Sequence, residues 1–239
     1  MATKTLSPRA QASRSTVALK ALMAVSGLIM VGYLLIHMYG NLKFFQGQER
    51  FDSYLEGLRN IAYPYLPHGG ALWILRVVLL SAVLAHAYSA VALWRRARTA
   101  SARRGANRYH SNQNRRGVQR SYASFTLRWG GIIILAFIVF HVLHFTAGVL
   151  HPGGDTDSKF QAMVNSFSIW YVTLAYVVAI LAVGFHLRHG LWSAFATLGA
   201  NTSTKRRRHL NIFATVLAVV IAGGFLVPPL SIALFGYGS

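Results

Sequence analysis

Six of the ten histidines lie inside long apolar runs, where an ionisable side chain is costly and usually marks a functional site. A neutral imidazole away from water still needs a partner for each ring nitrogen. A metal ion can satisfy one nitrogen, and a backbone carbonyl or a hydroxyl can satisfy the other. The chemistry that this pattern indicates is axial ligation of haem iron. The six residues are His37, His86, His141, His144, His186 and His189.

Two imidazoles can hold one haem only if they lie at the same depth on facing helices. A helix rises 1.5 Å per residue, so His37 is expected about 25 Å beyond Lys20 along its helix. On the same basis, His141 lies about 20 Å and His144 about 24 Å beyond Arg128. The spacing therefore predicts one haem level shared by His37 and either of these two histidines.

A second level is predicted closer to the opposite ends of two other helices. His86 lies about 13 Å before Arg95, whereas His186 and His189 lie about 18 Å and 14 Å before Leu198. Residues three apart share a helix face, so spacing alone leaves the choice open within both close pairs. The distances lean slightly towards His189, and at the first level towards His144.

Five apolar runs, each long enough to cross a bilayer as a helix, take up most of the 239 residues. We therefore predict an all-α integral membrane protein with one domain, residues 1–239, in which four helices form a haem-binding core. The first connection is expected to hold a short surface helix over Phe51–Ile61. The predicted spans are about 17–41, 72–94, 127–150, 169–198 and 210–235.

The formal net charge of +19 would indicate nucleic-acid binding in a soluble protein, but here its distribution indicates membrane topology. Arginine and lysine fill the N-terminal tail and the connections 95–127 and 199–209. Because positive residues collect on the cytoplasmic side, we expect the N-terminus inside, the C-terminus outside and no nucleic-acid partner. The acidic residues fall in the other two connections, and they are Glu49, Asp52, Glu56, Asp155 and Asp157.

Four segments around the histidines resemble the cytochrome b558 subunit of succinate dehydrogenases and the related fumarate reductases. The resemblance covers all five predicted spans. Its most specific segment is the last, in which His186 precedes a His-Gly-Leu-Trp-Ser stretch by three residues. The four segments read LLIHMYGNL at 34–42, LAHAYSA at 84–90, RWGGIIILAFIVFH at 128–141 and GFHLRHGLWS at 184–193.

The resemblance implies two b haems, each held by two histidines. His37 and His141 would hold the iron of a distal haem, and His86 and His186 the iron of a proximal haem. The same alignment makes the remaining two intramembrane histidines neighbours of the haems, with hydrogen bonds to a propionate or a quinone as their expected role. These two are His144 and His189.

Three basic residues are further candidates for the haem and quinone sites. By the resemblance, Lys20 and Arg128 would contact the propionates of the proximal haem or a quinone, since charge-assisted hydrogen bonds are strong in a low dielectric. Arg76 lies near the outer end of its span, where it could meet a distal propionate.

The family's role implies the partners of this chain. Succinate is oxidised in a cytoplasmic flavoprotein subunit, and electrons pass through an iron–sulfur subunit to the haems and then to a quinone, expected to be menaquinone. The absence of cysteine agrees, because this chain cannot bind an iron–sulfur cluster. The expected setting is the lipid of a bacterial cytoplasmic membrane, with a higher oligomer of the complex as a further possibility.

Two other classes of protein remain compatible with the residues. One is the haem b anchor of another respiratory enzyme, of the formate dehydrogenase or hydrogenase type, which would differ in its partner subunits. The other is a histidine-lined proton or metal transporter, which would be colourless. A proton carrier usually places acidic residues inside the membrane, and this chain has none inside a predicted span.

Overall fold

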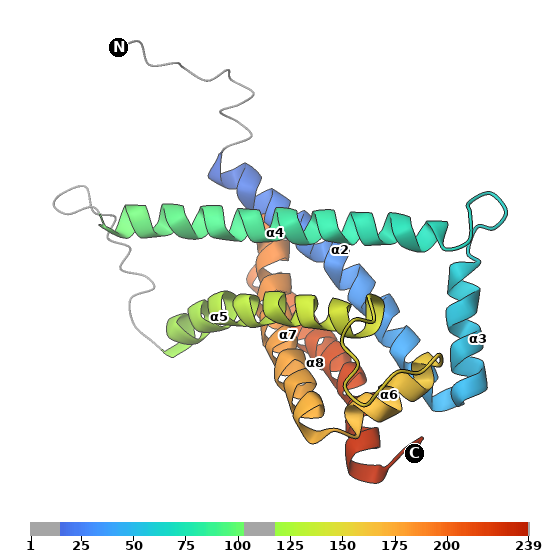
Figure 1. The fold of residues 1–239 in the computed structure, drawn as a ribbon. Helices are drawn as coiled ribbons and strands as arrows, with labels where there is room; N and C mark the ends of the chain where they lie inside the picture. The colour runs from blue at the N-terminus through green and yellow to red at the C-terminus, as the bar shows by residue number, and fades with distance from the viewer. Residues whose placement is uncertain (1–14, 103–117, 239) are drawn as a thin grey trace, which may run out of the picture.

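Figure 1 shows the computed structural model, which describes residues 15–102 and 118–238, with side chains described for 15–99 and 127–238. Within these residues the structure is all-helical, as predicted. The basic N-terminal tail and the middle of the connection 95–127 lie outside the described residues.

Five helices are long and apolar enough to cross a membrane, which agrees with the predicted fold class. In Figure 1, α4 and α5 lie across the view, whereas α7 and α8 stand at a steep angle to them. The third long helix continues from His141 into a π-helical turn, η3, over Val142–Thr146. The π-turn ends this span four residues before the predicted Leu150. The five are α2 (Thr16–Leu42), α4 (Gly70–Ala102), α5 (Val118–His141), α7 (Trp170–Thr197) and α8 (Thr204–Phe235).

The helix ends follow from local sequence. Ser15 and Ser203 cap α2 and α8 by accepting a hydrogen bond from a backbone N–H of the first turn. The helix α8 contains Pro228 and Pro229 but continues to Phe235, since membrane helices tolerate proline where neighbouring groups satisfy the freed carbonyls. Gly236 then ends it with a φ of 64°, a left-handed conformation that suits glycine.

Short helices close one end of the bundle, which we call the capped end. They are η1 (Lys43–Gln46), α3 (Gln48–Arg59) and α6 (Lys159–Phe167). The helix α3 confirms the predicted surface helix, although it begins three residues earlier, at Gln48, and ends at Arg59. The helix α6 was not predicted, because its nine residues follow a glycine-rich loop and carry no long apolar pattern.

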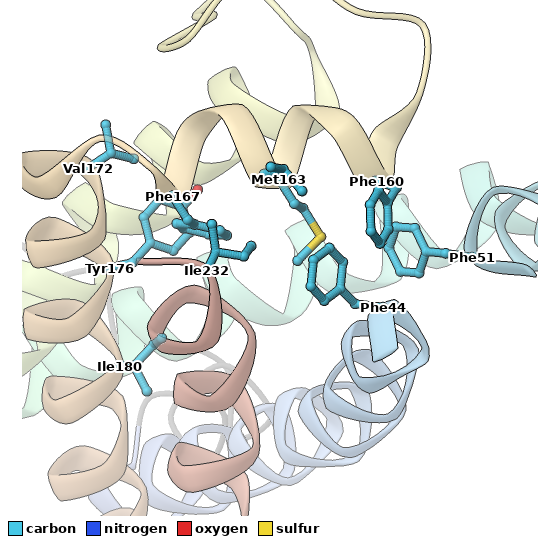
Figure 2. Packing of buried hydrophobic residues seen from close by; sticks show 10 residues of the cluster. Phe44, Phe51, Phe160, Met163, Phe167, Val172, Tyr176, Ile180 and Ile232 are labelled. Atoms are coloured by element: carbon cyan, nitrogen blue, oxygen red, sulfur yellow. The ribbon is translucent and has the colours of Figure 1, made fainter. Parts of the chain in front are cut away.

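Aromatic side chains join these short helices to the long ones (Figure 2). Phe44 is fully buried and stacks on Phe160 of α6, with ring centroids 4.5 Å apart, while Phe51 of α3 meets both rings edge-on. The same cluster includes Tyr176 of α7 and Ile232 of α8. The capped end therefore has a continuous apolar core that fixes α6 against the bundle.

Charge differs between the two ends of the bundle. All five acidic residues of the chain lie at the capped end, in α3 and in the loop before α6. At the opposite end, which we call the basic end, α4 carries Arg95, Arg96 and Arg98, and α8 begins with Lys205–Arg208. The predicted separation of charge is thus present in the fold, while its orientation in a membrane stays a prediction.

The helices α2 and α7 make most of the contacts between the long helices. The helix α2 packs against α4, α7 and α8, and α5 packs against α7. By contrast, α4 and α5 barely touch each other over the described residues. Neither α2 with α5 nor α4 with α7 is among the closely packed pairs over the described residues, so these helices can meet only through their side chains.

Candidate functional site: two histidine pairs

The first histidine pair joins α2 and α5 towards the capped end. The rings of His37 and His141 have centroids 5.8 Å apart and planes at 74°. His37 also stacks on Tyr33, one helical turn earlier, at 5.2 Å, and lies 5.5 Å from the ring of Phe225 on α8. Neighbouring aromatic rings thus surround this pair, which we call the capped-end pair.

The second pair joins α4 and α7 and lies closer to the basic end. The rings of His86 and His186 have centroids 6.1 Å apart and planes at 62°. We call this the basic-end pair. Each pair therefore takes one histidine from each of two helices, and the two pairs together use four different long helices.

Both separations suit a metal ion held between two imidazoles. A metal–imidazole bond is about 2.0–2.1 Å long, so two imidazoles on opposite sides of one ion have ring centroids roughly 6 Å apart. Over the described residues there is no group of three or more His, Cys, Asp or Glu side chains that could hold an ion by themselves. Two axial histidines are what haem iron needs, because the porphyrin supplies the other four nitrogens.

The basic-end pair has a fixed ring orientation at His86. Its Nδ1 lies 3.0 Å from the backbone carbonyl oxygen of Met23 on α2. Because a carbonyl can only accept, Nδ1 carries the proton and donates it, and Nε2 keeps the lone pair that a metal ion requires. The hydroxyl of Ser26 lies 3.5 Å from the same Nδ1 and donates to carbonyls of its own helix.

Two glycines allow close approach to this pair. A Cβ atom at Gly27 would lie 3.4 Å from Cε1 of His86, and one at Gly131 would lie 3.7 Å from Cε1 of His186. A larger side chain at Gly27 would therefore press on the imidazole. Glycine at both positions thus keeps side-chain atoms away from the two rings.

His144 has a different role from His141. It is buried, its Nδ1 lies 2.9 Å from the hydroxyl of Tyr176, and its Nε2 lies 2.9 Å from the hydroxyl of Ser166. Both nitrogens are therefore engaged by side chains. The hydroxyl of Tyr176 also lies 3.3 Å from Nδ1 of His141, which leaves Nε2 of His141 for a metal ion.

The structure thus brings His37 together with His141, although distances along the sequence leaned towards His144. The difference has a physical cause. His144 lies in the π-turn that follows His141, where each turn holds more residues than an α-turn, so the two side chains point differently from an ordinary pair three apart.

His189 hydrogen-bonds within its own helix. Its Nδ1 donates to the carbonyl oxygen of Phe185 on its own helix, at 3.2 Å, and its Nε2 lies 3.5 Å from the guanidinium of Arg188. Among the basic candidates, Lys20 and Arg128 are both exposed and lie one turn or less from Met23 and Gly131, respectively.

Arg76 lies at the capped end, in a cavity of about 200 Å³ beside His68. Its guanidinium is 4.8 Å from the ring centroid of Trp73. His68 donates a hydrogen bond of 2.9 Å to the carboxylate of Glu56, and this bond holds the pKa of Glu56 below its usual range. The structure does not place Arg76 in contact with either histidine pair.

The chain is 28% identical, over 202 residues, to the succinate dehydrogenase cytochrome b558 subunit of Bacillus subtilis (strain 168). The match covers 84% of this chain and 89% of that one. No protein-family model and no solved structure matches the chain.

The matched 202 residues make up most of both chains. The likeness is therefore to a whole membrane subunit and not to a shared fragment. At 28% identity it is a distant likeness, and it concerns a protein whose name includes a b-type cytochrome.

No sequence motif predicted three groups that orient the histidines: the carbonyl of Met23 and the hydroxyls of Tyr176 and Ser166. A signal existed for one of them. Tyr176 carries a hydroxyl in the second turn of an apolar span, and such a group needs a partner when it is buried. No signal indicated Ser166, because it lies on the unpredicted helix α6.

Proposed function

We propose that this chain is the membrane anchor and electron-transfer subunit of a succinate:quinone oxidoreductase and that it holds two b haems. The observation that carries the proposal is the meeting of four intramembrane histidines in two pairs, with ring centroids 5.8 and 6.1 Å apart. The distant relative, a succinate dehydrogenase cytochrome b558 subunit, supports the choice of enzyme.

In this proposal, each haem has two histidine ligands. His37 and His141 hold the distal haem, and His86 and His186 hold the proximal haem. Bound haem supplies one-electron transfer across the bundle, and the chain's part is to fix both ligands of each iron and to shield it from water. The tautomer of His86 that Met23 enforces suits this role.

The charge of the two ends supports an orientation. The basic end faces the cytoplasm, because arginine and lysine collect on that side, and it is there that the iron–sulfur and flavoprotein subunits dock. Lys20 and Arg128 lie at this end and are suited to contact propionates of the proximal haem or a quinone. The capped end, where Arg76 lies, then faces the outside.

The electron acceptor in this proposal is a quinone dissolved in the membrane, of the menaquinone type. The setting is the cytoplasmic membrane of a bacterium, and the whole chain, residues 1–239, acts as one membrane domain. Succinate oxidation itself takes place on the flavoprotein subunit, so the chain alone has no catalytic site for it.

The test is purification of the native complex in mild detergent through a tag on this chain. We expect two further subunits, one with covalent or tightly bound flavin and one with iron–sulfur clusters, and we expect succinate to reduce b-type haem in the complex. Formate or hydrogen as the effective reductant, with different partners, would assign the chain to another respiratory enzyme. A colourless chain without partners would contradict the proposal and favour a transporter.

A further inference from the structure

Resting on the proposed function, we infer that Tyr176, His144 and Ser166 form a hydrogen-bonded chain that fixes the tautomer of His141 and tunes the haem that His141 binds. The three are positioning residues, because they act through His141 and not on the haem itself. We call them the capped-end relay. They come from three different elements, since Tyr176 lies on α7, His144 in η3 and Ser166 on α6.

The relay is buried and continuous. Tyr176, His144 and Ser166 are 5%, 5% and 3% exposed, so water cannot substitute for their hydrogen bonds. Successive polar atoms lie 3.3, 2.9 and 2.9 Å apart from His141 Nδ1 to Ser166 Oγ. The last contact runs from Ser166 Oγ to the carbonyl oxygen of Pro152, at 3.2 Å.

The end of the relay determines the position of every proton in it. The carbonyl of Pro152 can only accept, so the Ser166 hydroxyl donates to it, and its oxygen accepts from Nε2–H of His144. Neutral His144 then has a lone pair on Nδ1, which accepts from the Tyr176 hydroxyl.

The same reasoning gives the position of the proton on His141, the proposed haem ligand. With its own proton donated to His144, the Tyr176 oxygen accepts from Nδ1–H of His141. His141 therefore has its proton on Nδ1 and a lone pair on Nε2, the nitrogen that haem iron would bind. The opposite order of donors would leave the contact between Ser166 and Pro152 without a proton, so only one order satisfies all four contacts.

The capped end holds the terminal carbonyl in place. Gly153 follows Pro152 with a φ of +93°, and a Cβ atom there would lie 2.7 Å from the carbonyl oxygen of Asn165, the residue before Ser166. The loop thus packs directly on α6. In turn, Asp52 of α3 accepts hydrogen bonds from the hydroxyl of Ser158, at 2.6 Å, and from the backbone N–H of Phe160, at 3.3 Å, which ties down the start of α6.

The relay has a consequence for the electronic properties of the ligand. An acceptor on the Nδ1–H of a metal-bound histidine makes the imidazole more basic and favours the more positively charged metal. Each hydrogen bond further along polarises the one before it. Loss of the acceptor should therefore raise the midpoint potential of the haem bound by His141, and loss of a more distant member should raise it less.

The experiment is a redox titration of both haems in the purified complex, followed by absorption and electron paramagnetic resonance. The variants are Tyr176→Phe, which removes the acceptor and keeps the ring, and Ser166→Ala, which removes the distant hydroxyl. The matched controls are Tyr171→Phe, on the exposed face of α7, and Ser168→Ala, whose hydroxyl bonds only to the carbonyl of Val164.

We expect one haem to shift to higher potential in Tyr176→Phe and by a smaller amount in Ser166→Ala, with the other haem and both controls unchanged. If Tyr176→Phe loses that haem, the shift of its potential in Ser166→Ala decides the inference. A merely structural role would lower stability without this ordered, one-haem shift. Unchanged potentials in both variants would overturn it.

The failure of this inference can be told apart from that of the proposed function. If the unaltered complex holds no haem, or if His141→Ala keeps both haems, the ligand assignment is wrong and the relay has no haem to tune. If His141→Ala loses one haem but Tyr176→Phe and Ser166→Ala leave its potential as it was, only the relay is wrong.

Discussion

The two histidine pairs differ in how the protein fixes the ligand on the outlying helix. At the basic-end pair, His86 donates directly to the backbone carbonyl of Met23 on the neighbouring helix. At the capped-end pair, His141 reaches a carbonyl only through the three side chains of the relay. Both arrangements leave a lone pair on Nε2 of the histidine. A backbone carbonyl fixes His86 directly, whereas side chains fix His141.

The two histidine pairs also differ in the side chains that surround them. The capped-end pair lies under an aromatic core that joins α3, α6 and η1 to the bundle, whereas the basic-end pair lies between small residues such as Gly27. If the proposed haems are bound, we expect the site at the capped-end pair to be built largely by this chain. The basic-end pair lies on the side proposed for the partner subunits.

The largest expected effect is the loss of one haem when a ligand is removed. His37→Ala should remove the capped-end haem and His86→Ala the basic-end haem, each lowering the ratio from two haems per chain to one. His189→Ala, whose imidazole bonds to its own helix, is the matched control and should keep both. Loss of a haem in His189→Ala would instead assign the ligand role at the basic-end pair to His189 in place of His186.

A bulky residue beside the basic-end pair should act almost as strongly. Gly27→Leu would push on the His86 ring, because even a Cβ atom would lie 3.4 Å from it, so the basic-end haem should be lost and the other kept. Gly32→Leu on the same helix, where a Cβ atom meets nothing within 4 Å, should retain both haems. Equal behaviour of the two variants would mean that Gly27 does not border a haem site.

Weakening the aromatic core should affect only the capped-end haem. Phe44→Ala empties a fully buried site, and such changes cost about 3–5 kcal/mol in protein cores. In a thermal melt followed by haem absorbance, the capped-end haem should be released at a lower temperature than in the unaltered protein. Phe235→Ala, at a ring that is 83% exposed, should change little. Early release of the basic-end haem instead would reverse the comparison.

The smallest effect separates the two ways of fixing a ligand. Ser26→Ala removes a hydroxyl 3.5 Å from Nδ1 of His86 but leaves the Met23 carbonyl, so the basic-end haem should keep its midpoint potential. Ser166→Ala at the other pair should raise the potential of its haem. A larger shift in Ser26→Ala than in Ser166→Ala would show that backbone control at the basic end is not sufficient.

Much of the fold could be predicted because a membrane requires long apolar helices. Each such helix, and the charged residues that flank it, can be recognised in one continuous segment of the sequence. The histidines were found in the same way, as polar residues where such residues are costly. Sequence spacing could not choose between His141 and His144, because the choice depends on a π-turn that no local pattern indicated.

The groups that orient the histidines could not be predicted for a related reason. Met23 acts through its backbone, so its side chain carries no signal. Ser166 acts only because α6 folds back beneath the bundle through Phe44 and Phe160, which are 116 positions apart in the chain. Such contacts depend on tertiary packing, which periodicity within a segment does not specify.

The most direct test of the central claim is the haem content of the unaltered chain. The complex would be purified under conditions that retain prosthetic groups, and extracted haem would be quantified against chain by amino-acid analysis. The account predicts two b haems per chain, both with low-spin spectra typical of two histidine ligands. A chain isolated intact with one haem or none would contradict it.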